Sequence, residues 1–263
     1  MQKLRLTAVS YLNTKPFIYG IFRGSLSDEV ELSLDIPSVC AQKLLDGRAD
    51  IALTPVAVLP SLPQAYLVSD YCIGATGTVK TVCLFAEKPI EEIKRLYLDF
   101  HSKTSATLAP ILCREVWGIQ PEFLVATEGF ENNIKGNTAG LVIGDRAIGL
   151  EKRFPFVYDL GEAWKKWTGL PFVFAAWVST KPLPSDFLAR FNAALQLGIA
   201  HIPELTQIIP GIPGFDMTAY FQENISYQLD EAKWQGLQRF LSLLPKEGHH
   251  TVHRMAPAML RPM

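Results

Sequence analysis

A chain of 263 residues is long enough for one large domain or for two lobes of ordinary size. Hydrophobic residues make up 48% of it and charged residues 19%, a composition typical of a well-packed globular protein rather than a disordered one. The formal net charge of −1 provides no general attraction to nucleic acid or to an anionic membrane, so we expect neither as a partner.

The N-terminal residues do not follow the pattern of a secretion signal. Lys3 and Arg5 could form a basic start, but polar residues at 13–15 interrupt the apolar segment that should follow. The longest apolar run, 170–178, is about half of what a bilayer crossing requires. We therefore expect a cytoplasmic protein.

Metal and cofactor motifs are missing from the sequence. The four cysteines are widely spaced with no CxxC pair, so neither a zinc knuckle nor a disulfide framework is indicated. His249, His250 and His253 form a cluster, but it lies in a tail containing Pro and Met, which is more typical of a solvated terminus than of a metal site. We expect no metal and no cofactor.

The first third of the chain alternates strands and helices. Apolar patterns predict strands at 4–9, 30–35 and 50–55, separated by one helix after residue 13 and another between Ser38 and Gly47. Asn13 or Thr14 is placed to cap the first helix, and Ser38 the second. This β-α-β-α-β order predicts a parallel sheet flanked by helices.

Polar residues follow the predicted strands of this sheet. Ligands of such sheets bind beyond the carboxyl ends of the strands, and free amides at a helix N-terminus attract anions. We therefore expect an anion site where these residues converge: Ser10, Tyr11, Asn13, Thr14, Ser38 and Thr54.

A second series of strands and helices begins near residue 87. A strand is predicted at 96–99, followed by a polar loop at 101–105 and a helix, and another strand at 141–143 ends at Asp145. Thr104 and Ser105, with a lysine beside them, could hold a carboxylate. The alternative is an ordinary helix cap, for which one hydroxyl suffices.

Two apolar segments, 81–86 and 172–178, resemble strands that cross between lobes. After them the chain is mostly helical, with Ser185 and Asp230 as expected caps. We therefore predict an α/β protein of two lobes with a hinged cleft between them. The first lobe would be discontinuous, 1–85 and 176–263, and the second would be the insertion 86–175.

The string Ser-Tyr-Leu-Asn-Thr-Lys-Pro at 10–16 resembles the opening of the chorismate dehydratases of the futalosine route to menaquinone. Those enzymes have a type 2 periplasmic-binding-protein-like fold, and the pattern L-x-x-G-x-x-D-I-A-L at 44–53 resembles a signature of such lobes. The resemblance continues to Trp177 through the segments 78–82, 144–145, 159–161 and 170–175. The family's Ser/Thr-rich loop is also present, with Lys103 where arginine is expected.

The resemblance implies conversion of chorismate into 3-[(1-carboxyvinyl)oxy]benzoate with loss of water. We expect Asn13 to be the catalytic residue. Two sources of the base remain open: a desolvated Asp99 or Asp145, or a carboxylate of the substrate itself, which we favour. The expected substrate contacts are Ser10, Tyr11, Thr14, Ser38, Thr54, Thr81, Thr104, Ser105 and Asp145.

Two other functions remain possible on the same fold. The sibling 1,4-dihydroxy-6-naphthoate synthase lacks the opening string at 10–16 and would need a histidine in the cleft, for which His101 is the only nearby candidate. A non-catalytic cytoplasmic binding protein for a small carboxylate is the other. The sequence does not indicate an oligomeric state.

Overall fold

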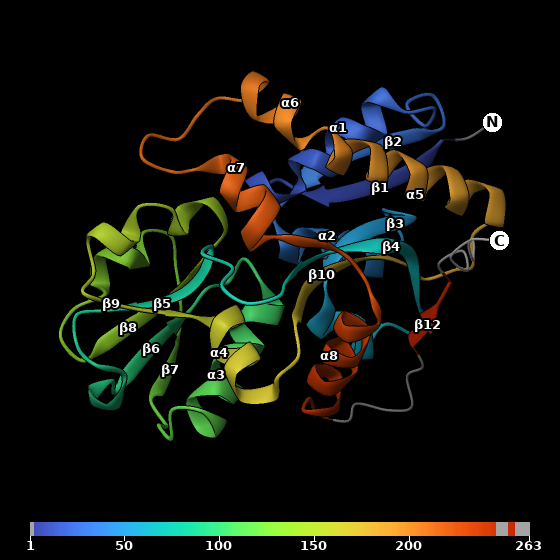
Figure 1. Cartoon of the computed structure of the whole chain (residues 1–263). Coiled ribbons are helices and arrows are strands. Elements are labelled where there is room, and N and C mark those ends of the chain that lie inside the picture. The colour runs from blue at the N-terminus through green and yellow to red at the C-terminus, as the bar shows by residue number, and fades with distance from the viewer. Residues whose placement is uncertain (1–2, 246–251, 256–263) are drawn as a thin grey trace.

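The computed structural model describes residues 3–245 and 252–255, which form two lobes side by side (Figure 1). Each lobe is built on its own sheet, and the predicted two-lobed α/β architecture is confirmed. One hydrophobic cluster extends through both lobes, and a smaller one lies around Phe85, Phe130 and Phe154 of the second lobe. No helix within the described residues is long and apolar enough to cross a membrane.

The sheet of the first lobe contains all three strands predicted in the first third of the chain. β1 pairs in parallel with both β2 and β3, as the alternation of strands and helices predicts, and β10 joins β3 in the antiparallel sense. β12 (Val252–Arg254) also pairs with β4, in the parallel sense, outside the linear order of the other six strands. The strand order is β11 (Ser226–Gln228), β4 (Ala65–Ala75), β10 (Phe172–Ser179), β3 (Ile51–Pro55), β1 (Leu4–Val9), β2 (Val30–Asp35).

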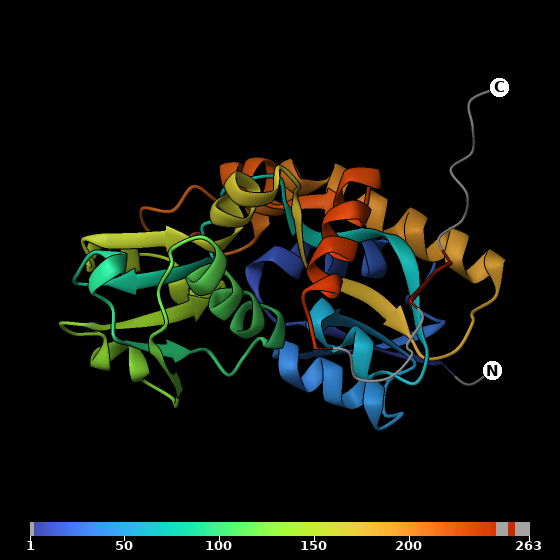
Figure 2. The ribbon, with the colours of Figure 1, turned by 90° about the horizontal axis from the view of Figure 1, so that it is seen from below.

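The sheet of the second lobe mixes parallel and antiparallel pairs. β6 runs parallel to β7 and β8, whereas β5 is antiparallel to β8 and β9. The helices α3 (Lys103–Glu115) and α4 (Leu160–Thr168) pack against each other on the side facing the first lobe (Figure 2). The strand order is β7 (Glu122–Val125), β6 (Arg95–Leu98), β8 (Thr138–Ile143), β5 (Val82–Ala86), β9 (Phe156–Asp159).

The remaining helices belong to the first lobe or connect its parts. They are α1 (Lys15–Arg23), α2 (Pro37–Leu45), α5 (Ser185–Ala200), α6 (Ile202–Ile208), α7 (Met217–Ala219) and α8 (Glu231–Ser242). A π-helical turn, Tyr220–Asn224, follows α7 directly. Short 3₁₀ turns occur at Leu12–Thr14, Val56–Ser61, Ile90–Glu92, Phe130–Asn133, Gly144–Ala147 and Leu150–Lys152.

The chain crosses between lobes at places that differ from the predicted ones. Among the described residues, β5 pairs with strands of the second sheet only, and β10 with strands of the first only. The expected boundaries after residues 85 and 175 therefore fall inside these two strands. A buried apolar strand has the same local pattern in either sheet, so its sequence does not show which sheet it joins. We propose lobe boundaries, and a hinge, at 76–81 and 169–171.

Two of the predicted helix caps, Ser38 and Ser185, are wrong, and a third, Thr14, is at the N-cap position but makes no capping bond. α2 begins at Pro37, whose fixed φ suits the first helical position, so Ile36 and not Ser38 precedes the helix. Thr14 precedes α1 without a side-chain capping bond, and α5 already includes Ser185. The predicted cap of α8 is confirmed, because the carboxylate of Asp230 accepts the backbone N–H of Lys233 at 2.8 Å.

The helices α1 and α5 cross at glycines, which lets their backbones touch. A Cβ atom on Gly198 would lie 1.8 Å from the carbonyl oxygen of Pro16, and one on Gly20 would lie 1.9 Å from the carbonyl oxygen of Ala194. Because α1 follows directly on residues 10–14, this crossing sets the position of the opening motif.

We expect Gly198→Ala to lower the free energy of unfolding by at least about 1–3 kcal/mol, because the added methyl group meets backbone that cannot move aside. Gly211→Ala is the matched control, since a Cβ there has no neighbour within 4 Å. It should change the free energy by less than about 0.5 kcal/mol. Urea unfolding followed by circular dichroism measures both, and equal values would contradict the tight crossing.

Candidate functional site

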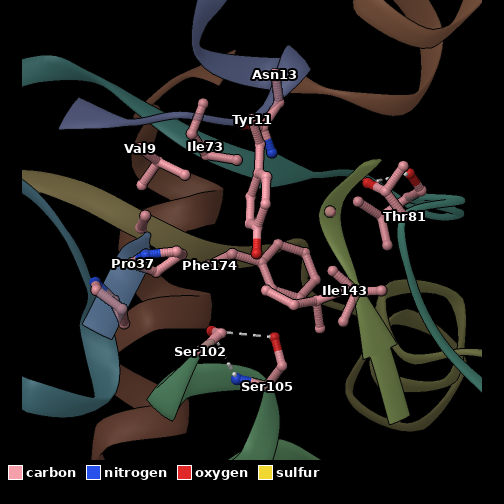
Figure 3. Close-up of a pocket in the computed structure, with 15 residues that line it drawn as sticks. Val9, Tyr11, Asn13, Pro37, Ile73, Thr81, Ser102, Ser105, Ile143 and Phe174 are labelled. Atoms are coloured by element: carbon pink, nitrogen blue, oxygen red, sulfur yellow. Dashed lines mark hydrogen bonds between the residues drawn. The ribbon is translucent and has the colours of Figure 1, made fainter. Parts of the chain in front are cut away.

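A cavity lies between the lobes, beyond the carboxyl end of β1 and beside the N-terminus of α3 (Figure 3). Its apolar wall includes Val9, Ile73, Val79, Val82, Ile143 and Phe174. Its polar side chains are Tyr11, Asn13, Thr81, Ser102 and Ser105. None of the described residues that line it is charged, so any anion held here would be bound by neutral donors.

Four of the residues predicted from the sequence line this cavity: Tyr11, Asn13, Thr81 and Ser105. The other predicted residues lie outside the lining. Ser10 and Lys103 are exposed to solvent, and Thr14 and Thr54 are fully buried. The remaining ones, Ser38, Thr104 and Asp145, connect the two lobes.

Three backbone N–H groups of the first lobe donate hydrogen bonds to the second lobe around the cavity. The backbone N–H of Leu12 donates to the carboxylate of Asp145, with distances of 2.9 and 3.1 Å to its two oxygens. The N–H of Ser38 donates to the carbonyl of His101 at 3.0 Å. The N–H of Ala57 donates to Oγ1 of Thr104 at 3.2 Å. These residues therefore close the cleft rather than line it.

Tyr11 reaches from the first lobe to the second. Its hydroxyl lies 2.5 Å from Nδ1 of His101, in the loop before α3. Burial raises the pKa of Tyr11 well above its ordinary value, so the phenol keeps its proton. Burial, together with the charge of Arg146, lowers the pKa of His101, so its imidazole is neutral near pH 7.

A buried ion pair lies behind this contact. The carboxylate of Asp99 is fully buried, pairs with Arg146, and accepts the backbone N–H groups of His101 at 2.9 Å and Ile143 at 3.1 Å. Arg146 also donates to Glu131 at 2.9 Å. Asp99 therefore joins the loop before α3 to the end of β8, and it does not line the cavity.

Asn13 is held by groups from both ends of the chain. Its side-chain oxygen accepts the hydroxyl of Thr14 at 3.2 Å, and its backbone carbonyl accepts the hydroxyl of Tyr227 at 3.0 Å. Beside it, the hydroxyls of Tyr220 and Thr81 lie 2.9 Å apart. Asn13 also lines the cavity, where its amide N–H groups are candidate donors to a ligand.

Sequence reasoning missed several of these residues. Ser102, the N-cap of α3, lies in the predicted polar loop, and its position before the helix was a usable signal. Phe174 lies in a segment read only as a crossing strand. Tyr220 and Tyr227 lie more than 200 residues from Asn13 and carry no local motif, so nothing in the sequence placed them here.

Among the described residues, no group of His, Cys, Asp and Glu is arranged to hold a metal ion. Of the histidines near the C-terminus, His253 lies in β12 with its ring stacked on Tyr66. His249 and His250 fall outside the described residues.

A family model described as menaquinone biosynthesis matches residues 4–246, nearly the whole chain. The chain belongs to this menaquinone biosynthesis family. A chorismate dehydratase of Thermus thermophilus is 26% identical to it over 231 residues, which cover 80% of this chain and 84% of that relative.

Solved structures show the same fold at low sequence identity. A protein of Archaeoglobus fulgidus aligns with a TM-score of 0.66 at 14% identity, covering 91% of this chain and 96% of that one. A Candida albicans protein described as having the generic periplasmic binding protein fold aligns with a TM-score of 0.60 at 13% identity, covering 92% of this chain and 90% of that one. The aliphatic sulphonate binding protein of Escherichia coli aligns with a TM-score of 0.54 at 14% identity, covering 92% of this chain and 86% of that one. The periplasmic-binding-protein-like fold is thus confirmed.

The contact between the ring of Tyr11 and Gly144 provides a test of the closed cleft. Gly144 has a φ of +66°, and a Cβ there would lie 2.6 Å from a ring carbon of Tyr11. Gly149 has a φ of +86° and open space around it. We expect Gly149→Ala to lose about 1–2 kcal/mol of unfolding free energy from the left-handed backbone alone.

Gly144→Ala should lower the free energy of unfolding by about 1–3 kcal/mol more than Gly149→Ala does, because its methyl group forces Tyr11 away from the second lobe. Urea denaturation of the two variants under the same conditions measures the difference. If the two variants lower the free energy of unfolding equally, the lobes do not meet at Tyr11 as described.

Proposed function

We propose that this chain is a cytoplasmic carbon–oxygen lyase that converts chorismate into 3-[(1-carboxyvinyl)oxy]benzoate and water, in the futalosine route to menaquinone. The observation that carries the proposal is the cavity between the lobes, whose polar lining consists of hydroxyls and the amide of Asn13. The chain's membership of a menaquinone biosynthesis family and its similarity to a chorismate dehydratase support it.

The cavity offers donors for a dianion on two sides. Ser102 and Ser105 lie at the N-terminus of α3, where the helix dipole and free amides favour a carboxylate by about 0.3–2 kcal/mol. Asn13 and Thr81 lie on the other side of the ring of Tyr11 (Figure 3). A ligand with two carboxylates can therefore contact both lobes at once, which favours closure of the cleft.

The reaction removes the hydrogen on C3 of chorismate and the hydroxyl on the neighbouring C4, and the ring becomes aromatic. Asp99 and Asp145, the two candidate bases of this chain, both accept backbone N–H bonds, and neither lines the cavity. This supports the carboxylate of the substrate's own enolpyruvyl group as the base. Aromatisation favours the products, so the protein mainly orients the substrate and stabilises developing charge.

The position of His101 argues against the sibling synthase reaction. Its ring reaches the cavity only through the hydroxyl of Tyr11 and is not part of the lining. A non-catalytic binding protein on this fold would bind chorismate and leave it unchanged.

Incubation of the purified protein with chorismate, followed by liquid chromatography with ultraviolet detection, tests the proposal. We expect chorismate to be consumed and 3-[(1-carboxyvinyl)oxy]benzoate to form in equal amount. Binding by calorimetry without product would indicate the binding protein instead. If the protein neither binds nor converts chorismate, the chorismate proposal is refuted.

Asn13→Asp tests the catalytic role of the amide. Aspartate is nearly isosteric, but it removes the N–H donors and adds a negative charge facing an anionic substrate. We expect turnover to fall at least ~100-fold, the scale for one preorganised donor, with a melting temperature within a few degrees of the parent. The control is Asn132→Asp: the side chain of Asn132 accepts a hydrogen bond from Arg153 and does not line the cavity, so this variant should keep full activity.

Ser105→Ala tests the carboxylate subsite at α3. We expect chorismate affinity, measured by calorimetry, to fall by about 1–3 kcal/mol through loss of a hydrogen bond to a charged group. Thr107→Ala removes a hydroxyl from the same helix, one that bonds the carbonyl of Lys103 instead of facing the cavity. Unchanged affinity in Ser105→Ala would remove this serine from the site.

A further inference from the structure

We infer that Tyr11 is a second catalytic residue, which gives its phenol proton to the C4 hydroxyl of the substrate as that hydroxyl departs. His101 acts as the positioning residue for Tyr11. The inference rests on the proposed dehydration, and it supplies the acid that this reaction needs and that Asn13 cannot provide.

The first argument is the chemistry of the lining. Hydroxide is a poor leaving group unless it receives a proton as the carbon–oxygen bond breaks. Among the described residues that line the cavity, Tyr11 has the only ionisable side chain; the others are amide, alcohol or apolar. Figure 3 shows its ring crossing the cavity, with the hydroxyl beside Phe174 and directed toward Ser102 and Ser105.

The second argument is the group behind the phenol. With its proton on Nδ1, the neutral imidazole of His101 donates to the oxygen of Tyr11 across the 2.5 Å contact. The O–H of Tyr11 is then free to point at the substrate. Burial and the charge of Asp99 raise the pKa of Tyr11, and the positive charge of Arg146 acts against them. The N–H of His101 would donate to the phenolate oxygen as the proton leaves.

The charged groups around His101 fit this role. Asp99 accepts the backbone N–H of His101, and Arg146 bridges Asp99 and Glu131. The ring is therefore held between a buried ion pair and the phenol. A hydrogen bond of the imidazole to Asp99 itself would compete with the contact to Tyr11, and no such bond is formed among the described residues.

The proton balance closes within the substrate and Tyr11. The enolpyruvyl carboxylate takes the proton from C3, and that electron pair forms the new ring double bond. The C4–oxygen bond breaks, and the oxygen takes the phenol proton and leaves as water. The phenolate then recovers a proton from the carboxylic acid formed in the first step. One chorismate gives one product and one water, with no other reactant.

The competing explanation is that Tyr11 only holds the cleft closed through its contacts with Gly144 and His101. A leaving group that departs without a proton separates the two roles. The probe is a chorismate analogue with fluorine in place of the C4 hydroxyl, because fluoride leaves as a weakly basic anion. A structural role would slow both substrates, whereas an acid role would slow only chorismate.

The test compares Tyr11→Phe with Tyr19→Phe, a phenol of α1 that bonds Glu204 on the surface. We expect Tyr11→Phe to lower kcat for chorismate by about 100-fold, with KM changed by less than about 3-fold. For the fluoro analogue, kcat should fall by less than about 5-fold. Tyr19→Phe should match the parent on both substrates.

His101→Gln should show the same pattern to a smaller degree: slower turnover of chorismate and little change with the fluoro analogue. Equal losses of Tyr11→Phe on both substrates, or turnover of chorismate within about 3-fold of the parent, would overturn the inference while leaving the proposed function intact. If the parent protein does not convert chorismate at all, the proposed function fails and the inference fails with it.

Discussion

The hydrogen bonds between Asp145 and the backbone N–H of Leu12 are the interaction on which the site depends. The cavity has walls from both lobes, so it exists only while the lobes are held together. Asp145 follows β8 of the second lobe, and Leu12 lies in the opening motif of the first. This contact places Tyr11 and Asn13 opposite the N-terminus of α3. The bonds of Ser38 and Ala57 to the second lobe support the same closed arrangement.

The charged residues near the cavity are used to build it and do not line it. Asp99, Arg146 and Glu131 pair with one another behind the loop that carries His101. A carboxylate in the lining would repel a dianion, whereas hydroxyls and amides can bind it without an opposing charge. In our proposal, the absence of a protein carboxylate from the described lining leaves the substrate's own carboxylate as the base. Binding and catalysis in our proposal thus follow from one property of the cavity.

The C-terminal part of the chain contributes to the site although it carries no recognisable motif. Tyr220 lies in a π-helical turn, a feature that often marks functional regions, and its hydroxyl lies beside that of Thr81. Tyr227 bonds the backbone of Asn13. The first lobe is discontinuous, so these late residues return to the opening motif and fix its backbone.

The sequence by itself determined the first three strands, the helices between them and the family. The strand at 30–35 and the parallel order of the first three strands were predictable, because the period of apolar residues reports locally which face is buried. The position of the opening motif at the end of β1 followed from the same pattern, and Asn13 and Tyr11 do face the cavity. Only the tertiary structure decided which neighbouring hydroxyls face it. Thr104 and Ser105 are adjacent, yet successive residues of a helix point in different directions, so one binds Ala57 and the other lines the cavity. The pairing of Tyr11 with His101, and of Tyr227 with Asn13, depends on how two lobes and a returning chain pack together. No local pattern encodes such contacts, because their energy comes from residues far apart in the sequence.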